Sequence, residues 1–327
     1  MNGVVNKLIP NPAKNVLKKI YAVVFRSRLK IKEKDEEIKA LKYQVEYLKH
    51  HFDITQMKPA TGYLREFQLK ELDFTRQILK LLEPYGITPF LDGGALLGAC
   101  RHGGFIPWDD DIDLSVTREQ FNRLIDIAKK DFVWVDSTKK NCFSAKFYDM
   151  AIRENPGKYV FILTPFCLHL FQGTSLRNSM NLEFFPNDYV REEVTEEQYI
   201  AYREKICNFV HGNLNWKDRF DFYEKELETN NIYSQEPTSR ITPGIGSWDL
   251  TEFKFRGFRS TSDLFPLQPI PFENTALPAP SNPKAILEVS YGKNWMQFPD
   301  DVGTPHTLEE QNLYFKSIGE PIDYSEF

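Results

Sequence analysis

The sequence of 327 residues predicts an α+β fold preceded by a helical extension. Strand-like and helix-like segments follow one another without the steady strand–helix–strand rhythm that a doubly wound parallel sheet requires. The first 58 residues contain no strand-like segment, and their charge differs from that of the remainder. Since a domain usually has about 100–200 residues, we expect an N-terminal helical region over residues 1–58 and one larger domain over residues 59–327.

The N-terminal region carries a concentrated positive charge. Residues 1–34 contain nine Lys and Arg and one acid, Glu33, whereas the remainder has 32 basic and 45 acidic residues. A basic head on an acidic body indicates an anionic partner for the head alone, and it argues against nucleic-acid binding by the body. As a helix, Ala13–Lys32 is basic and amphipathic. Two interpretations stay open for it, namely peripheral contact with anionic lipid and a helix that is solvated or packed on protein.

No apolar run reaches the roughly 18–20 residues of a spanning helix, and no secretory signal is recognisable. We therefore expect a cytoplasmic protein that begins near Met1, and the lipid interpretation would place it on the inner face of the cell membrane. Cys100, Cys142, Cys167 and Cys207 form no C-x-x-C pair, which disfavours a zinc site or a redox dithiol.

The next stretch has heptad spacing. Ile31, Ile38, Val45 and Phe52 recur every seven residues, and leucines lie between them at 41 and 48. Such a seam over about three heptads is the lower limit for a coiled coil. A homodimer through this helix and a single helix docked on its own domain both remain open.

The larger domain begins after a break at residues 59–62. Apolar spacing predicts a helix over 64–82, a strand over 87–92, a short helix over 95–100, a loop over 101–104 and a strand over 112–116. Capping-box patterns at Thr117/Gln120 and Thr195/Gln198 predict helices that end near 130 and 210. Further strands are predicted over 144–152, 159–163, 167–171 and 180–185, and residues 232–283 are expected to form loops with short strands such as 251–258.

The most informative segment is an acidic cluster that leads into a strand. Four aspartates stand at positions 109, 110, 111 and 113, after Trp108 and before the apolar alternation of residues 112–116. In a strand, Asp109, Asp111 and Asp113 would share a face, and their mutual repulsion would be relieved by a cation. Carboxylates of this kind bind Mg²⁺ or Mn²⁺, which commonly recruit substrate phosphates. The spacing does not fit an EF-hand or a glycosidase pair.

A glycine pair precedes this cluster. Gly93-Gly94 follows a predicted strand, and glycines there allow a phosphate to approach the backbone closely. Alone, the pair is more often a plain turn. The order of strand, Gly-Gly, short helix and Asp-x-Asp on the next strand is the layout of the nucleotidyltransferase superfamily.

Residues 91–114 resemble a known family more closely. They read LDGGALLGACRHGGFIPWDDDIDL, which resembles the LicD/fukutin signature of a Gly-rich turn, Leu-Leu-Gly, Arg-His and Gly-Phe-Ile-Pro-Trp-Asp-Asp-Asp-Ile-Asp. Weaker similarity extends over Asn181–Asp188 and parts of residues 265–295, so the resemblance covers roughly residues 60–308.

The resemblance implies a nucleotidyltransferase-like mixed sheet flanked by helices and a phosphotransferase that depends on Mg²⁺ or Mn²⁺. Members of this family move phosphocholine or ribitol phosphate from a CDP-activated alcohol to a hydroxyl of a cell-surface glycan or glycolipid, and CMP is released. The expected setting is the synthesis of surface polysaccharide, such as lipopolysaccharide or capsule.

The resemblance also assigns roles to residues. Asp111 and Asp113 match the paired metal carboxylates, and Glu183 matches the third, where the family commonly has Asp. These three are the expected catalytic and metal-binding residues. The glycine-rich segment that should lie against the donor phosphates is matched by Gly93, Gly94 and Gly98, and the Arg-His pair that should hold the donor is matched by Arg101 and His102.

Two alternatives remain beside phosphoalcohol transfer. The same metal site could attack an α-phosphate, which would make the protein a nucleotidyltransferase that forms an NDP-linked product. The other alternative is a non-catalytic scaffold protein that retains the acidic residues of a former active site. The presence of Glu183 where the family commonly has Asp supports this alternative.

Overall fold

The computed structural model describes residues 11–137, 144–212, 215–246, 257–299 and 306–319. The chain divides into two compact units. The first comprises Met1–Asp53 with Gln297–Asp301, and the second comprises Ile54–Met296 with Val302–Phe327.

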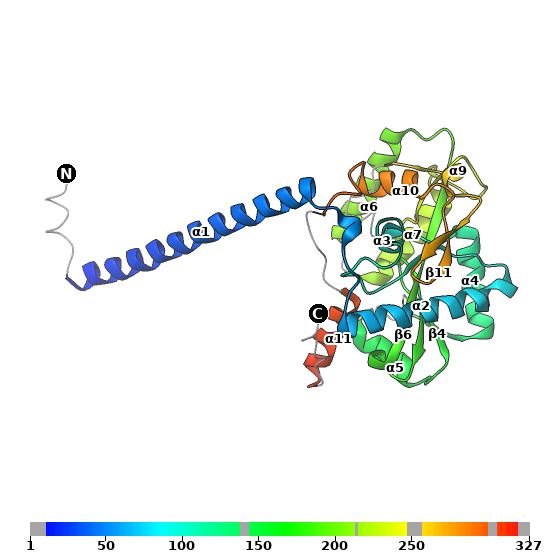
Figure 1. Ribbon diagram of the computed structural model, residues 1–327, viewed down its shortest axis with the longest axis horizontal. Helices are drawn as coiled ribbons and strands as arrows, with labels where there is room; N and C mark the ends of the chain where they lie inside the picture. Colours follow the sequence, from blue (N-terminus) through cyan, green and yellow to red (C-terminus); the bar gives the residue numbers. More distant parts are fainter. Residues whose placement is uncertain (1–10, 138–143, 213–214, 247–256, 300–305, 320–327) are drawn as a thin grey trace. The chain divides into compact units, whose positions relative to one another are not determined.

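The first unit consists mainly of α1 (Asn11–His51), one uninterrupted helix (Figure 1). The helix expected over this region is therefore present. The apolar side chains of Ile31, Ile38 and Leu41 are about half exposed, so the heptad seam is largely open to solvent along this stretch. Among the described residues, no helix is both long and apolar enough to cross a membrane.

The second unit is built on a mixed sheet. Its main path has the order β1-β2-β6-β5-β4-β3, in which β2–β6 and β3–β4 are parallel and the other neighbours are antiparallel. Beyond this path, β7 and β8 pair with the far end of β6, and β9 pairs with β8. The strands are β1 (Phe90–Leu91), β2 (Asp113–Thr117), β3 (Val133–Asp136), β4 (Tyr159–Leu163), β5 (Leu168–Gly173), β6 (Ser179–Val190), β7 (Tyr233–Ser234), β8 (Arg240–Pro243) and β9 (Arg259–Ser260).

Helices flank this sheet. The unit also contains a separate two-stranded hairpin of β10 (Gln268–Phe272) and β11 (Thr275–Ala279). The helices are α2 (Gly62–Leu82), α3 (Gly93–His102), α4 (Arg118–Asp131), α5 (Ala145–Arg153), α6 (Glu196–Gly212), α7 (Trp216–Thr229), α9 (Thr261–Leu264), α10 (Pro283–Tyr291) and α11 (His306–Ser317). Short 3-10 turns occupy Ile54–Gln56, Glu83–Tyr85 and Leu176–Asn178. A mixed sheet with helices on it confirms the predicted α+β class.

Both predicted N-caps form, but only the second is a complete capping box. The hydroxyl of Thr117 accepts from the backbone N–H of Gln120, and that of Thr195 accepts from the N–H of Gln198. At the second box, the Gln198 side chain also accepts from the N–H of Thr195, so the box is reciprocal there.

One predicted strand is wrong. Residues 144–152, expected to be extended, form most of α5. Ser144 caps this helix by accepting from the N–H of Phe147, and the buried Phe147, Ala151 and Ile152 lie at helical spacing. The local cap and the period of the apolar residues therefore favour the helix. Most of the strand suggested over 251–258 lies outside the described residues.

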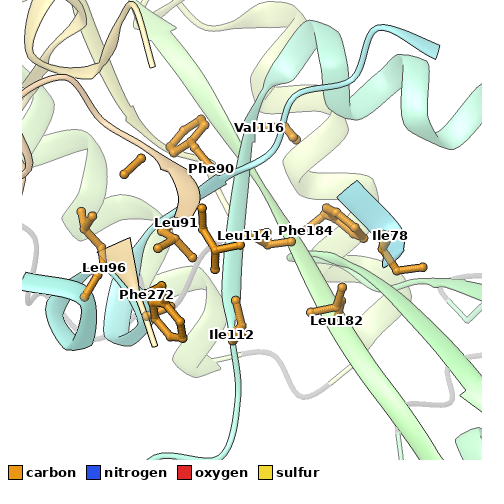
Figure 2. Close-up of a cluster of buried hydrophobic side chains, with 14 of the residues drawn as sticks. Ile78, Phe90, Leu91, Leu96, Ile112, Leu114, Val116, Leu182, Phe184 and Phe272 are labelled. Carbon is orange, nitrogen blue, oxygen red and sulfur yellow. The ribbon is translucent and has the colours of Figure 1, made fainter. Parts of the chain in front are cut away.

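The core lies between the sheet and the helices that pack on it. Figure 2 shows Leu114 of β2, Phe184 of β6 and Ile78 of α2 in one buried cluster. Alternation along β2 and β6 places Leu114 and Phe184 on one face, while Asp113 and Glu183 point to the other. The same alternation that fills the core thus brings two carboxylates side by side.

Candidate functional site

The glycine turn between β1 and α3 is anchored by a buried ion pair. Asp92 caps α3 by accepting from the N–H of Gly93. Its other oxygen accepts from the Ser115 hydroxyl at 2.8 Å and from the Arg259 guanidinium at 2.5 Å. Arg259 is almost fully buried, so the turn is held by charge-assisted bonds to β2 and β9.

The two glycines of this turn lie against carboxylates of the acidic segment. Gly93 has φ +51°, and a Cβ on it would lie 2.5 Å from Asp113 Oδ2. A Cβ on Gly94 would lie 2.7 Å from Asp109 Oδ2 and 4.0 Å from Asp113 Oδ2. The N-terminus of α3, which favours anions, therefore adjoins a group of carboxylates that favours cations.

The acidic segment differs from the expected strand in where it starts. β2 begins at Asp113, so Asp109 and Asp111 lie on the preceding loop and their positions do not follow strand alternation. Carboxylate oxygens of Asp109, Asp110 and Asp111 nevertheless all lie within 4.8 Å of one another. Asp110 is buried, and its carboxylate accepts a hydrogen bond from the backbone N–H of Leu308 in α11 at 2.7 Å. This bond ties the acidic loop to the start of α11.

Glu183 comes from the neighbouring strand. It is in register with Asp113 across the parallel β2–β6 pair and with His169 across the antiparallel β5–β6 pair. His169 Nδ1 lies 3.1 Å from Glu183 Oε1, and Cys167 Sγ lies 3.3 Å from His169 Nε2. Burial lowers the pKa of His169, but Cys167 and the Glu183 carboxylate together raise it well above its usual value.

The Cys167–His169 pair was missed from the sequence. Residues 167 and 169 alternate on a strand and so share a face, and the cross-strand neighbour of His169 is Glu183. Together, the three side chains could hold a metal ion, since their ligand atoms lie within 4.8 Å of one another. The alternation was visible in the sequence, but the pairing of the two strands was not.

Side chains outside the recognised motif fix the loop that precedes the acidic segment. Gln68 of α2 is buried and donates to the carbonyl of Asp109 at 2.7 Å and to that of Ile106 at 3.3 Å. Arg65 of α2 forms a two-point ion pair with Glu273, which also accepts from the N–H of Phe105. These polar residues lie beside the apolar positions of α2, and that break in the pattern is the signal that could have revealed them.

Of the predicted Arg-His pair, Arg101 is buried and His102 is half-buried. Arg101 donates to the carbonyl of Trp295, and burial lowers its pKa. Burial, and then the charge of Arg101, lowers the pKa of His102. Neither ring nitrogen of His102 has a hydrogen-bond partner within the part of the chain that the structure describes.

Gly98, the third glycine of the predicted donor segment, is closely packed. A Cβ at this position would lie 2.5 Å from the carbonyl oxygen of Gly104, so close packing alone accounts for glycine there.

A large cavity lies at the other end of the same strands. It has a volume of about 970 Å³, and its lining includes Arg118, Phe121, Pro186 and Asp188. These residues follow or end the paired stretch of β2 and β6, whereas Asp113 and Glu183 begin it. Thr164 also lines this cavity, and its hydroxyl lies 3.4 Å from Cys167 Sγ, which in turn lies 3.9 Å from Glu183 Oε2, so the cavity reaches toward the Glu183 side of the site.

The donor set fits a hard divalent cation. Asp109 and Asp113 offer carboxylate oxygens beside the glycine turn, and Asp110 and Asp111 lie with Asp109. Glu183 is the cross-strand neighbour of Asp113, but its carboxylate lies with Cys167 and His169 and is not grouped with the aspartates. Mg²⁺ and Mn²⁺ prefer such ligands, and Mg²⁺ is usually held by one or two carboxylates plus substrate phosphates.

Known proteins are similar to this chain over part of its length. Residues 86–214 match the family model for the LicD/FKTN/FKRP nucleotidyltransferase domain. The lipopolysaccharide cholinephosphotransferase LicD of Haemophilus influenzae is 48% identical over 64 residues, which are 20% of this chain and 24% of that protein. Ribitol 5-phosphate transferase FKRP of Mus musculus and of Homo sapiens is 32% identical over 81 residues, 22% of this chain and 16% of each relative.

The matched segments therefore span less than a quarter of the length of these relatives. The family model, over residues 86–214, covers the part of the chain that carries the glycine turn, the acidic segment and Glu183. Over residues 86–214, the chain is therefore similar to the nucleotidyltransferase domain of the LicD/FKTN/FKRP family.

Proposed function

We propose that this protein transfers a phosphorylated alcohol from a CDP-activated donor to a hydroxyl of a cell-surface glycan and releases CMP, with Mg²⁺ or Mn²⁺ as cofactor. One observation carries the proposal. The Gly93-Gly94 turn, at the N-terminus of α3, lies directly against the carboxylates of Asp109 and Asp113. A diphosphate bound at that helix end would be within reach of a cation held by those carboxylates.

The reaction class follows from the relatives. One relative is named a cholinephosphotransferase and the other a ribitol 5-phosphate transferase, so both move a phosphorylated alcohol. In the proposed step, the acceptor hydroxyl oxygen bonds to the β-phosphorus of the donor while the bond from that phosphorus to the CMP oxygen breaks. The hydroxyl proton passes to a carboxylate of the acidic segment or to water, and CMP leaves.

This chain's residues have distinct tasks in that step. Asp111, Asp113 and Glu183 would hold the cation, which when bound offsets the negative charge on the transferring phosphoryl group. Gly93 and Gly94 let the donor diphosphate approach the backbone amides of α3. His169 holds the Glu183 carboxylate from the neighbouring strand at 3.1 Å.

The basic segment over residues 1–34 supports a location at an anionic membrane surface, because polybasic segments are attracted to anionic lipid. Such a position would bring the catalytic domain near a lipid-linked glycan acceptor. We include this location in the proposal.

The test is a donor screen with the full-length protein and Mn²⁺. CDP-choline, CDP-ribitol, CDP-glycerol and CDP-ethanolamine are compared by thermal shift and then by CMP release. A ligand that binds only the folded state raises the melting temperature. Release of CMP from one of these donors supports the proposal, whereas pyrophosphate release from CTP with no CMP from any donor would indicate a nucleotidyltransferase instead.

A further inference from the structure

One stripe of α1 is apolar although it is open to solvent. The first position of successive heptads is a β-branched residue, at Val24, Ile31, Ile38 and Val45. Val24, Ile31 and Ile38 are 45%, 60% and 48% exposed. Because apolar residues at regular heptad spacing form the seam of a coiled coil, this stripe is a surface on which a second helix can pack.

The fourth position of each heptad completes the seam. Leucine stands there at 41 and 48, and Leu41 is 53% exposed. Ser27 and Lys34 occupy this position in the two earlier heptads. The Lys34 ammonium pairs with Glu37 at 2.7 Å on the surface, so the alkyl stem of Lys34 can lie along the seam while its charge stays in water. β-branched residues at the first position with leucine at the fourth favour two parallel helices.

The residues that flank the seam carry complementary charges. In a parallel, in-register pair, the seventh residue of one heptad faces the fifth residue of the next heptad on the other helix. In α1 these facing positions are Lys30 with Asp35 and Glu37 with Lys42. Both combinations join opposite charges, and all four residues are exposed. The flanks of α1 are therefore complementary to a second α1 in the parallel orientation.

A second copy of this chain is the partner that fits these features. A symmetric interface requires a surface that is complementary to itself, and both the seam and its flanking charges meet that requirement. The heptads span residues 24–48, about 36 Å of one uninterrupted helix. The competing interpretation is a helix docked on its own chain, but such docking would cover Ile31 and Ile38, which are exposed.

We propose that two copies of this chain associate through α1 as a parallel, in-register coiled coil. The proposal is independent of the proposed function, because it concerns only the first unit. Parallel pairing places the two basic segments of residues 1–34 at the same end of the dimer.

The first experiment measures the mass of the full-length protein by sedimentation equilibrium over a series of concentrations. Ile38→Asp places two carboxylates against each other in the seam. Tyr43→Asp introduces the same residue at a position outside the seam, where the tyrosine is 74% exposed, and serves as the matched control. Both positions are exposed in the single chain, so neither change removes a buried contact within it.

We expect the native protein and Tyr43→Asp to be dimers with the same Kd. The Kd of Ile38→Asp should be at least about 100-fold higher, because the dimer loses two buried isoleucines that each contribute about tenfold or more. A native protein with the mass of one chain at every concentration would overturn the proposal. So would an Ile38→Asp variant that dimerises with the native Kd.

The second experiment tests the orientation and does not depend on the aspartate variant. Leu41→Cys places a thiol in the seam, and Tyr43→Cys places one outside it as the control. After treatment with oxidised glutathione, the links are identified in proteolytic peptides, because the chain has four other cysteines. We expect a disulfide between the two copies at position 41 and none at position 43. A dimer that forms no link at position 41 would overturn the parallel, in-register arrangement.

Discussion

Replacement of Gly93 by alanine tests whether the glycine turn positions the acidic site. Gly93 has φ +51°, a conformation that costs an alanine about 1–2 kcal/mol. The new Cβ would also lie 2.5 Å from Asp113 Oδ2, whereas ordinary contacts begin at 3.4 Å. The carboxylate oxygen must therefore move by about 0.9 Å, the difference between those two distances.

The two effects have different consequences. The backbone cost alone should lower the melting temperature by a few degrees, about 2–4 °C for each kcal/mol in a domain of this size. The displaced carboxylate should lower the rate much more, because a misplacement of about 1 Å can cost about 100-fold. We therefore expect Gly93→Ala to stay folded and to lose about 100-fold in Mn²⁺-dependent CMP release.

Gly157→Ala is the matched control. Gly157 has φ +74°, and a Cβ on it would meet nothing within 4 Å. Both variants pay a similar backbone cost, so only the contact with Asp113 differs between them. The assays are thermal unfolding and single-turnover CMP release, measured on both proteins. Equal activity of the two variants would refute the claim that the turn positions Asp113.

Three further predictions follow from packing, charge and the N-terminal segment. Gly98→Ala should lower the free energy of unfolding in urea by about 1–3 kcal/mol, because the new Cβ would lie 2.5 Å from the Gly104 carbonyl oxygen. Alanine on its own would favour the helix, so a more stable variant would contradict this prediction. Glu273→Gln should cost about 1–3 kcal/mol near neutral pH by weakening the bonds to Arg65. The bonds from Arg65 lower the pKa of Glu273 below its ordinary 4.5, so the Glu273 contribution is present above about pH 4.5 and lost as the pH falls through the folded-state value; a difference from the native protein that stays constant in acid would be inconsistent with this. Removal of residues 1–34 should abolish co-flotation with anionic vesicles, and equal flotation of both forms would exclude the membrane role.

The local part of the site could be predicted from the sequence. The order of glycine turn, helix and acidic strand depends on neighbouring residues, so the turn at Gly93-Gly94 and the carboxylate of Asp113 were expected and lie together. The register of Asp113 with Glu183 was expected only through the family resemblance, because pairing of distant strands leaves no local signal.

The rest of the site depends on contacts between distant segments. Arg259 reaches Asp92 across 167 positions of the sequence, and Glu273 reaches Arg65 across 208. Neither Arg259 nor Glu273 stands out in the sequence by its local composition or by a regular spacing. Residues 144–152 show the opposite case, in which the cap at Ser144 was visible but the apolar run was interpreted with the period of a strand instead of a helix.

The central claim is that the carboxylates of the acidic segment hold the cation for phosphoalcohol transfer. The most direct measurement is Mn²⁺-dependent CMP release from the donor identified in the screen, compared among the native protein, Asp111→Asn and Asp113→Asn. We predict that both variants remain folded and lose CMP release. Undiminished CMP release in both variants would contradict the account.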